Sequence, residues 1–394
     1  MVLRPAVQQR LTTIDALRGF SLFGILIVNI SVFASTFYGS GTPDPAFSGQ
    51  FDRLVQGFVA LFFETKFYLL FSFLFGYSFT LQMRSAERAG QVFVPRMVRR
   101  QLGLLVIGAA HAVLLFHGDI LSTYALLGIA LLAMRHQSPR QMLKTAGLLI
   151  IVTASSWMLL GSLQLLEGGI GDVEQASIRA EAARAAYTGS PAGVIWQHMR
   201  ELPQMGLVLV LMQGPCALAM FLVGFVAGEK RIFERLEDHQ PMLRRFVLAG
   251  SVVGLTGASV FAVTTVWLAG SGWEPFGLGI GLLTAPLLSG VYVVVAMKVF
   301  RSRIGDWITG CLAPAGRMAL TNYLFQSFAC SLIFTAYGLG LVGEIAPAWT
   351  VALALVIFAV QLFLSHMWMR VFAYGPLEWV LRALTTASWP AWHV

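Results

Sequence analysis

Long apolar segments dominate this sequence and decide what it can fold into. About ten stretches are apolar over enough residues to cross a hydrocarbon layer roughly 30 Å thick, which takes a helix of about 20 residues. Because lipid offers no hydrogen-bond partners, such stretches must satisfy their backbone groups internally, as helices do. We therefore predict an all-α, polytopic membrane bundle with spans at 16–37, 66–83, 98–117, 119–134, 145–166, 205–227, 246–270, 277–299, 317–340 and 347–372.

Composition supports a membrane protein with a single domain. Only 12% of the residues are charged, whereas a soluble domain has about 25%. No linker or repeat divides residues 1–394, so we predict one transmembrane domain. Two external loops are long, 38–65 and 167–204, and both contain stretches that favour interfacial or capping helices. Each loop is either a lid over the outer face or inert packing.

The net charge of +8 is distributed by side, which predicts the orientation. With the N-terminus inside, the cytoplasmic ends and loops hold 22 of the 27 Lys and Arg residues. This bias satisfies the positive-inside rule and places both termini in the cytoplasm. It also accounts for the positive charge without a nucleic-acid partner. The five basic residues on the outer side are Arg53, Lys66, Arg179, Arg184 and Arg200.

The apolar stretch 104–132 contains titratable side chains, which cost roughly 2.5–3.5 kcal/mol each at membrane depth. His111 and Asp119 flank a tight outer hairpin, so Asp119 could orient the imidazole as a general base. The alternative is that Asp119 only caps a helix. His117, at the water interface, is interpreted as incidental. Tyr124 and Lys66 are further candidates for the same polar pocket.

A second polar set follows the first predicted span. Asp15 and Arg18 lie at the cytoplasmic boundary, and Asn29 follows eleven residues after Arg18 on nearly the same helical face. One interpretation is a contact at a helix end plus one amide bond between helices. The other is a polar face that lines a cavity open to the cytoplasm.

The third set lies in APAGRMALTNYLFQS, residues 313–327. Asn322 and Gln326 share a helix face and either join helices or meet a ligand. Arg317 and Arg18 supply guanidinium groups suited to phosphate recognition, with membrane anchoring as the alternative. Glu378, in the C-terminal YGPLEWVLR, is expected to pair with one of the inner arginines. The sequence has no metal-ligand spacing, so no metal is predicted.

Five separated motifs carry a family resemblance. TIDALRGFSLFGILIVNI, KFYLLFSFLFGYSFTLQ, RRQLGLLVIGAAHAVLLFHGDILSTYALLG, GRMALTNYLFQS and YGPLEWVLR occur in this order. Together they resemble the YeiB-like bacterial membrane proteins, whose C-terminal half is the domain of unknown function 418. That family is distantly similar to the transmembrane acyltransferases, which include the heparan glucosaminide N-acetyltransferase. The resemblance implies a multi-pass protein of the bacterial inner membrane.

The first of three hypotheses is a transmembrane acyltransferase, in which an acyl group passes from cytoplasmic acyl-CoA to a small-molecule acceptor at the outer face. The donor phosphates would lie on Arg18 and Arg317, and His111 with Asp119 would deprotonate the acceptor. Asn29, Asn322 or Gln326 would stabilise the oxyanion. Two alternatives stay open: a proton-coupled transporter or exporter, and a non-catalytic membrane scaffold. Membrane lipid is an expected partner, and a homodimer is left open.

Overall fold

The computed structural model describes residues 5–168, 173–234 and 237–393, which are largely helical and contain no β-strand. The first half comprises α1 (Pro5–Ala34), η1 (Pro45–Phe47), α2 (Gln50–Phe62), α3 (Lys66–Arg88), α4 (Phe93–Leu114), α5 (Leu121–Met134), α6 (Pro139–Leu166), α7 (Val173–Gly189) and α8 (Pro191–Val208). The second half comprises η2 (Leu209–Gln213), α9 (Gly214–Glu229), η3 (Ile232–Glu234), η4 (Glu237–His239), α10 (Gln240–Trp267), α11 (Trp273–Val299), α12 (Arg303–Arg317), α13 (Ala319–Phe334), α14 (Pro347–Trp368) and α15 (Pro376–Thr386).

The predicted helical membrane bundle is confirmed. In the described ranges, eight helical segments are long and apolar enough to cross a membrane, and each coincides with a predicted span. The other two predicted spans, 119–134 and 317–340, correspond to the shorter apolar helices α5 and α13, of 14 and 16 residues. The span predicted to end at residue 340 stops early because Thr335 is extended and a loop with left-handed Gly340 and Gly343 follows.

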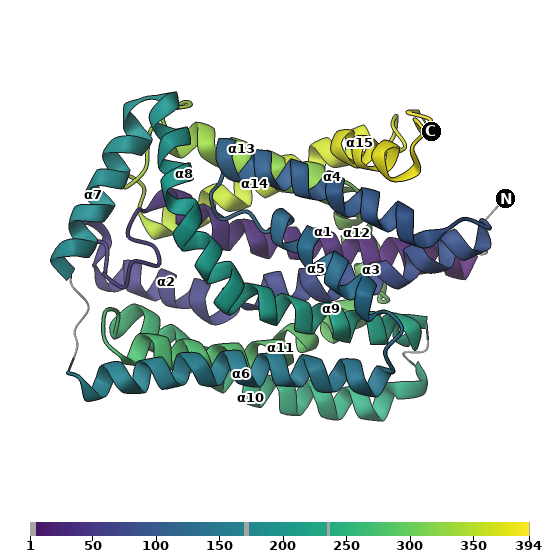
Figure 1. Ribbon diagram of the computed structural model, residues 1–394, viewed down its shortest axis with the longest axis horizontal. Coiled ribbons are helices and arrows are strands. Elements are labelled where there is room, and N and C mark those ends of the chain that lie inside the picture. Colours follow the sequence, from purple (N-terminus) through teal and green to yellow (C-terminus); the bar gives the residue numbers. More distant parts are fainter. Residues whose placement is uncertain (1–4, 169–172, 235–236, 394) are drawn as a thin grey trace.

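The two ends of the bundle differ in what they hold (Figure 1). Both termini lie at one end, which we call the inner end because its short loops carry most of the Lys and Arg. The opposite, outer end holds α7 and the N-terminal part of α8. The predicted external loops therefore contain helices: α2 lies within 38–65, and α7 with most of α8 within 167–204. Helices α6, α10 and α11 form a layer along one side of the bundle.

Glycines bring the helix backbones of the bundle into direct contact. A Cβ atom at Gly316 of α12 would lie 1.7 Å from the Asp15 carbonyl oxygen of α1, and one at Gly19 would lie 2.4 Å from the Leu312 carbonyl oxygen. Small residues of this kind let membrane helices pack closely through van der Waals contact. This contact fixes the start of α1, and with it Asp15, against the end of α12 that carries Arg317.

Helix α12 was not predicted, because its charged first turn and its proline are typical of a loop. Arg303 and Asp306 lie in that first turn, and Pro314 lies near the C-terminal end. The helix forms because Ser302 caps it, accepting a hydrogen bond from the Gly305 amide at 3.1 Å. Its apolar face then packs along α1, which is enough to offset one interior proline.

Candidate functional site

The His111–Asp119 pair forms as predicted and lies near the outer end of α4. His111 Nδ1 is 2.8 Å from Asp119 Oδ1, and the two side chains are 0% and 2% exposed. Burial matters here because a charge-assisted hydrogen bond is stronger where water is excluded. The contact fixes the ring orientation of His111, which is what a positioned base requires.

Asp119 also caps α5, so this residue makes both of the contacts weighed from the sequence. Its Oδ1 accepts a hydrogen bond from the Leu121 amide at 3.1 Å, and its Oδ2 accepts one from the Ser122 amide at 2.8 Å. The close approach depends on Gly108 of α4, where a Cβ atom would lie 2.6 Å from the Ser122 amide nitrogen. The helix start therefore holds the carboxylate in place, and the carboxylate in turn holds His111.

The second ring nitrogen of His111 is available for chemistry. Its Nε2 is buried and has no hydrogen-bond partner among the described residues. The ring packs against Tyr323 of α13, with the ring centroids 5.1 Å apart, and against Phe116 at 6.2 Å. A carboxylate on Nδ1 favours the tautomer with a proton on that nitrogen, so Nε2 carries the lone pair. This arrangement can accept a proton.

A second polar network lies beside this pair, and the sequence analysis missed it. His117, interpreted there as incidental, has its Nδ1 3.0 Å from Glu201 Oε2 of α8. The hydroxyl of Tyr187 donates to the same oxygen at 2.6 Å. His198 Nδ1 lies 3.1 Å from the carbonyl oxygen of Val113. Helices α7 and α8 are thus joined to the α4–α5 turn by polar contacts, and form a cover over it.

The titration of this network follows from burial. Burial raises the pKa of Tyr187, and the adjacent Glu201 carboxylate raises it further, so the phenol stays protonated and donates. Burial lowers the pKa of His117, with Glu201 acting in the opposite direction. The spacing of His198 and Glu201, three residues apart on one helix face, was the available signal in the sequence.

Tyr124 and Lys66 make their polar contacts away from the His111–Asp119 pair. The prediction that these residues share one polar pocket with the pair is therefore wrong. The Tyr124 hydroxyl is 2.6 Å from Ser72 Oγ of α3 and lies in the apolar core. Lys66 Nζ donates to the Ala60 carbonyl oxygen at 2.7 Å and lies 5.3 Å from the centroid of the Phe261 ring of α10. Thr65, the residue before Lys66, has a φ of 65°, which turns the chain just before α3 begins.

Asp15 and Arg18 form an ion pair at the inner end of α1, as one interpretation predicted. Arg18 Nη1 donates to Asp15 Oδ1 at 2.6 Å, and its Nη2 donates to Ser78 Oγ of α3, also at 2.6 Å. Arg317 is exposed and acts on Asp15 through its charge. Of the two predicted arginines, Arg18 contacts this carboxylate and Arg317 is near enough to act on it through its charge.

Glu378 does not pair with these arginines by direct contact, which corrects the expectation. Its Oε1 accepts hydrogen bonds from the Leu320 amide at 2.6 Å and the Thr321 amide at 3.0 Å, and Oε2 accepts from the Thr321 hydroxyl at 2.6 Å. A carboxylate here satisfies the free N–H groups at the start of α13 and complements the helix dipole. Burial raises the pKa of Glu378, while these hydrogen bonds act to lower it.

The amides of α13 join it to neighbouring helices. Asn322 Nδ2 donates to Ser365 Oγ of α14 at 2.9 Å, and Gln326 Nε2 donates to Gln361 Oε1 at 2.9 Å. This is the helix-joining alternative of the two weighed from the sequence. Asn29 is half-buried, and its side-chain amide makes no hydrogen bond with a described residue.

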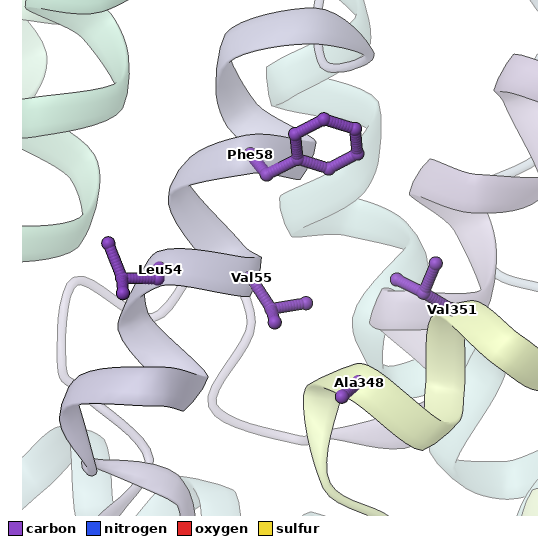
Figure 2. Close-up of a pocket in the computed structure, with 5 residues that line it drawn as sticks. All are labelled: Leu54, Val55, Phe58, Ala348 and Val351. Carbon is purple, nitrogen blue, oxygen red and sulfur yellow. The ribbon is translucent and has the colours of Figure 1, made fainter.

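Two cavities in the described part of the chain are lined by residues that include none of the predicted site residues. One, of about 310 Å³, is an apolar groove between α2 and α14 (Figure 2). The other, of about 460 Å³, lies at the inner end around Glu229 and His239. No three His, Cys, Asp or Glu side chains in the described ranges are grouped as metal ligands. The groove is lined by Leu54, Val55, Phe58, Ala348 and Val351.

Comparison with known proteins places the chain in a family. Residues 227–388 match the family model described as "Protein of unknown function (DUF418)". Along nearly its whole length the chain is 34% identical to the uncharacterized protein YxaH of Bacillus subtilis (strain 168), covering 97% of this chain and 95% of that protein. The chain belongs to the DUF418 family. It is also 26% identical to the uncharacterized protein YeiB of Escherichia coli (strain K12), covering 97% and 98% respectively.

These matches confirm the predicted YeiB-like family, and the eight long apolar helices support its multi-pass membrane character. The matched DUF418 segment contains Arg317, Asn322, Gln326 and Glu378, whereas His111 precedes it. The full-length matches to YxaH and YeiB extend the relationship over the N-terminal half as well. The names of these relatives state no activity, so the chemistry has to be argued from the site itself.

Proposed function

We propose that this DUF418-family protein is a bacterial inner-membrane acyltransferase that uses cytoplasmic acyl-CoA and acylates an acceptor at the outer face. The observation that carries the proposal is the buried His111–Asp119 pair, with Nδ1 fixed by the carboxylate and Nε2 without a partner. A histidine held in this way is the usual general base for transfer to a hydroxyl or amine. We expect it to contribute about 10²–10⁴-fold to the rate.

In the proposed reaction, His111 Nε2 takes the proton of the acceptor hydroxyl as its oxygen attacks the thioester carbonyl carbon. The carbon–sulfur bond then breaks, and the leaving thiolate takes the proton back from the imidazolium. Asp119 stays ionised and stabilises the imidazolium while the charge is present. The products are the acylated acceptor and free coenzyme A, and no other reactant is needed.

The positions of the inner arginines support a route across the membrane. Arg18 lies in the N-terminal half of α1 and Arg317 ends α12 near the same carboxylate, so both are suited to the donor phosphates, while His111 lies near the C-terminal end of α4. Arg100 and His111 are eleven residues apart on α4, which is about 16 Å along a helix axis. An extended thioester arm bridging these two levels would run beside α1, α4 and α13.

The acceptor requires an opening, because the His111 side chain is fully buried. The cover formed by α7 and α8 is the element that would move. It contacts the α4–α5 turn through polar groups of His198 and Glu201, and its residues Ala183, Tyr187 and Val194 also pack in a buried apolar cluster. Opening therefore has to break both kinds of contact, and covers of this type open on the microsecond to millisecond timescale.

One observation favours the alternative of proton-coupled transport. His111, His117 and His198 lie close together at the outer end, and the rings of His117 and His198 are 5.7 Å apart. Titratable side chains in a row within a membrane bundle can relay protons. This alternative predicts proton movement without consumption of a thioester, so a single preparation can separate the two functions.

The test uses purified protein in liposomes containing a native lipid and glycan extract as acceptor source. Radiolabelled acyl-CoAs from acetyl to palmitoyl are supplied at the inner side, and label transfer and free thiol are measured. We expect transfer by the wild type and its loss in His111→Ala, with His366→Ala as the control histidine on α14. A wild type that consumes none of these donors, or a His111→Ala variant with full turnover, overturns the proposal. Proton flux measured with an internal pH dye would then support transport.

A further inference from the structure

A third arginine, Arg100 of α4, joins Arg18 and Arg317 at the inner end of the bundle. Arg100 interacts electrostatically with both Arg18 and Glu378, and Arg317 interacts with Asp15, the ion-pair partner of Arg18. The five side chains therefore form one charged cluster, which we call the inner arginine cluster: Asp15, Arg18, Arg100, Arg317 and Glu378.

Both carboxylates of the cluster already accept hydrogen bonds. Glu378 accepts three hydrogen bonds from residues 320 and 321 at the start of α13. Asp15 accepts a hydrogen bond from Arg18. Arg100 makes no hydrogen bond with a described residue, and its Nε atom is buried. Three guanidinium groups thus face two carboxylates, and one of the three has an unsatisfied buried donor.

Such an arrangement is costly unless an anion joins it. Like charges repel more strongly where water is excluded, and a buried donor to a charged group costs more than an ordinary hydrogen bond when left unmade. A phosphate group offers several acceptor oxygens and matches the planar fork of a guanidinium group. The start of α13 cannot supply this site because Glu378 already occupies it.

We propose that Arg18, Arg100 and Arg317 form a binding site for a phosphate-bearing anion at the inner membrane boundary, with Arg100 as the residue that decides affinity. That this anion is the phosphate portion of the acyl donor rests on the proposed function. The same chemistry is offered by the headgroup of an anionic lipid of the inner leaflet. The anion site itself is independent of acyl transfer and can be tested without it.

The test measures the melting temperature of purified protein in neutral detergent with millimolar pyrophosphate, against sodium chloride of equal ionic strength. We expect the wild type to gain about 2–4 °C from pyrophosphate. Arg100→Gln should lower pyrophosphate affinity roughly ten- to hundredfold, since each hydrogen bond to a charged group contributes about 1.5–3 kcal/mol. Arg99→Gln is the matched control, because Arg99 is the preceding residue of α4 and is exposed. It should bind within about twofold of the wild type.

Arg100→Lys keeps the positive charge but loses the planar fork of the guanidinium group, so it should bind pyrophosphate more weakly than the wild type. This variant tests the site if Arg100→Gln does not fold. A lipid arm repeats the measurement in nanodiscs with and without phosphatidylglycerol. If phosphatidylglycerol stabilises the wild type and pyrophosphate does not, and Arg100→Lys loses this stabilisation, the site binds a lipid headgroup. No response to either anion, or equal responses from Arg99 and Arg100 variants, overturns the inference. Pyrophosphate binding without acyl-CoA consumption keeps the site and rejects the acyltransferase.

Discussion

The double role of Asp119 makes Asp119→Asn the sharpest perturbation of the proposed base. The amide can place its oxygen at the Oδ2 position and still accept from the Ser122 amide, the shorter cap contact at 2.8 Å. Its NH₂ group then faces His111 Nδ1 and donates to it, so the ring proton must move to Nε2. The variant keeps much of the helix cap and removes the lone pair that the mechanism needs.

The expected magnitudes separate the two roles. Asp119→Asn leaves the Leu121 amide without an acceptor and should cost about 1–2 kcal/mol of stability. Asp119→Ala removes the cap and also leaves the buried His111 Nδ1–H unpaired, for about 2–4 kcal/mol in all. A wrong histidine tautomer lowers turnover about 10⁴-fold in serine proteases. We therefore expect Asp119→Asn to lose acyl transfer at least a hundredfold while it still folds.

Three measurements follow both variants: thermal unfolding in detergent, acyl-CoA consumption, and NMR shifts of isotopically labelled histidine ring nitrogens. His111→Gln assigns the His111 signals by their disappearance. In the wild type we expect the proton on Nδ1, and in Asp119→Asn we expect it on Nε2. A tautomer that stays on Nδ1, or a tautomer change with unaltered turnover, would refute the reasoning.

Three further predictions concern packing, pH and backbone strain. Gly316→Ala should cost about 1–3 kcal/mol in thermal unfolding, because its Cβ would overlap the Asp15 carbonyl; no loss would contradict the close α1–α12 contact. The pKa of His117 lies below its usual 6.5, so the stabilisation present above pH 6.5 should decline as the pH falls below that value. His117→Gln should flatten this decline and His136→Gln, at an exposed site, should not. Thr65→Gly should raise stability by about 1 kcal/mol, since a β-branched residue at φ 65° is strained; a lower melting temperature would show that the Thr65 side chain contributes more.

The apolar segments predicted the fold because lipid leaves a spanning chain few options. Length and hydropathy suffice to locate a helix that must satisfy its own backbone, and the spans agree with the helices. Apolar segments fail to predict a helix that is not apolar along its whole length. Helix α12 has charge in its first turn, and besides its Ser302 cap it is stabilised by the contact of Gly19 and Gly316 with neighbouring backbone. That contact joins residues about 300 positions apart and leaves no local pattern.

The site was predictable only where its residues are close in sequence. His111 and Asp119 are eight positions apart across one turn, so their pairing followed from the hairpin. Glu201 meets His117 across 84 positions, and its segment resembles an ordinary polar loop. Glu378 was expected to find an arginine because opposite charges attract. The free amides of Leu320 and Thr321 are the stronger attraction, since they offer a carboxylate directed hydrogen bonds that it would otherwise have to take from water.

Helix α4 carries two buried side-chain nitrogen atoms without a hydrogen-bond partner among the described residues. Arg100 Nε and His111 Nε2 belong to the same helix and each lacks a partner that its chemistry requires. A protein that only packed its helices would lose nothing by replacing both with apolar residues, since unpaired buried donors and charges oppose stability. Arg100 and His111 lie eleven residues apart on one helix, and the presence of both is explained if each contacts a different part of one ligand. Arg100→Gln should then weaken donor binding and leave the His111 tautomer unchanged, whereas Asp119→Asn should do the reverse.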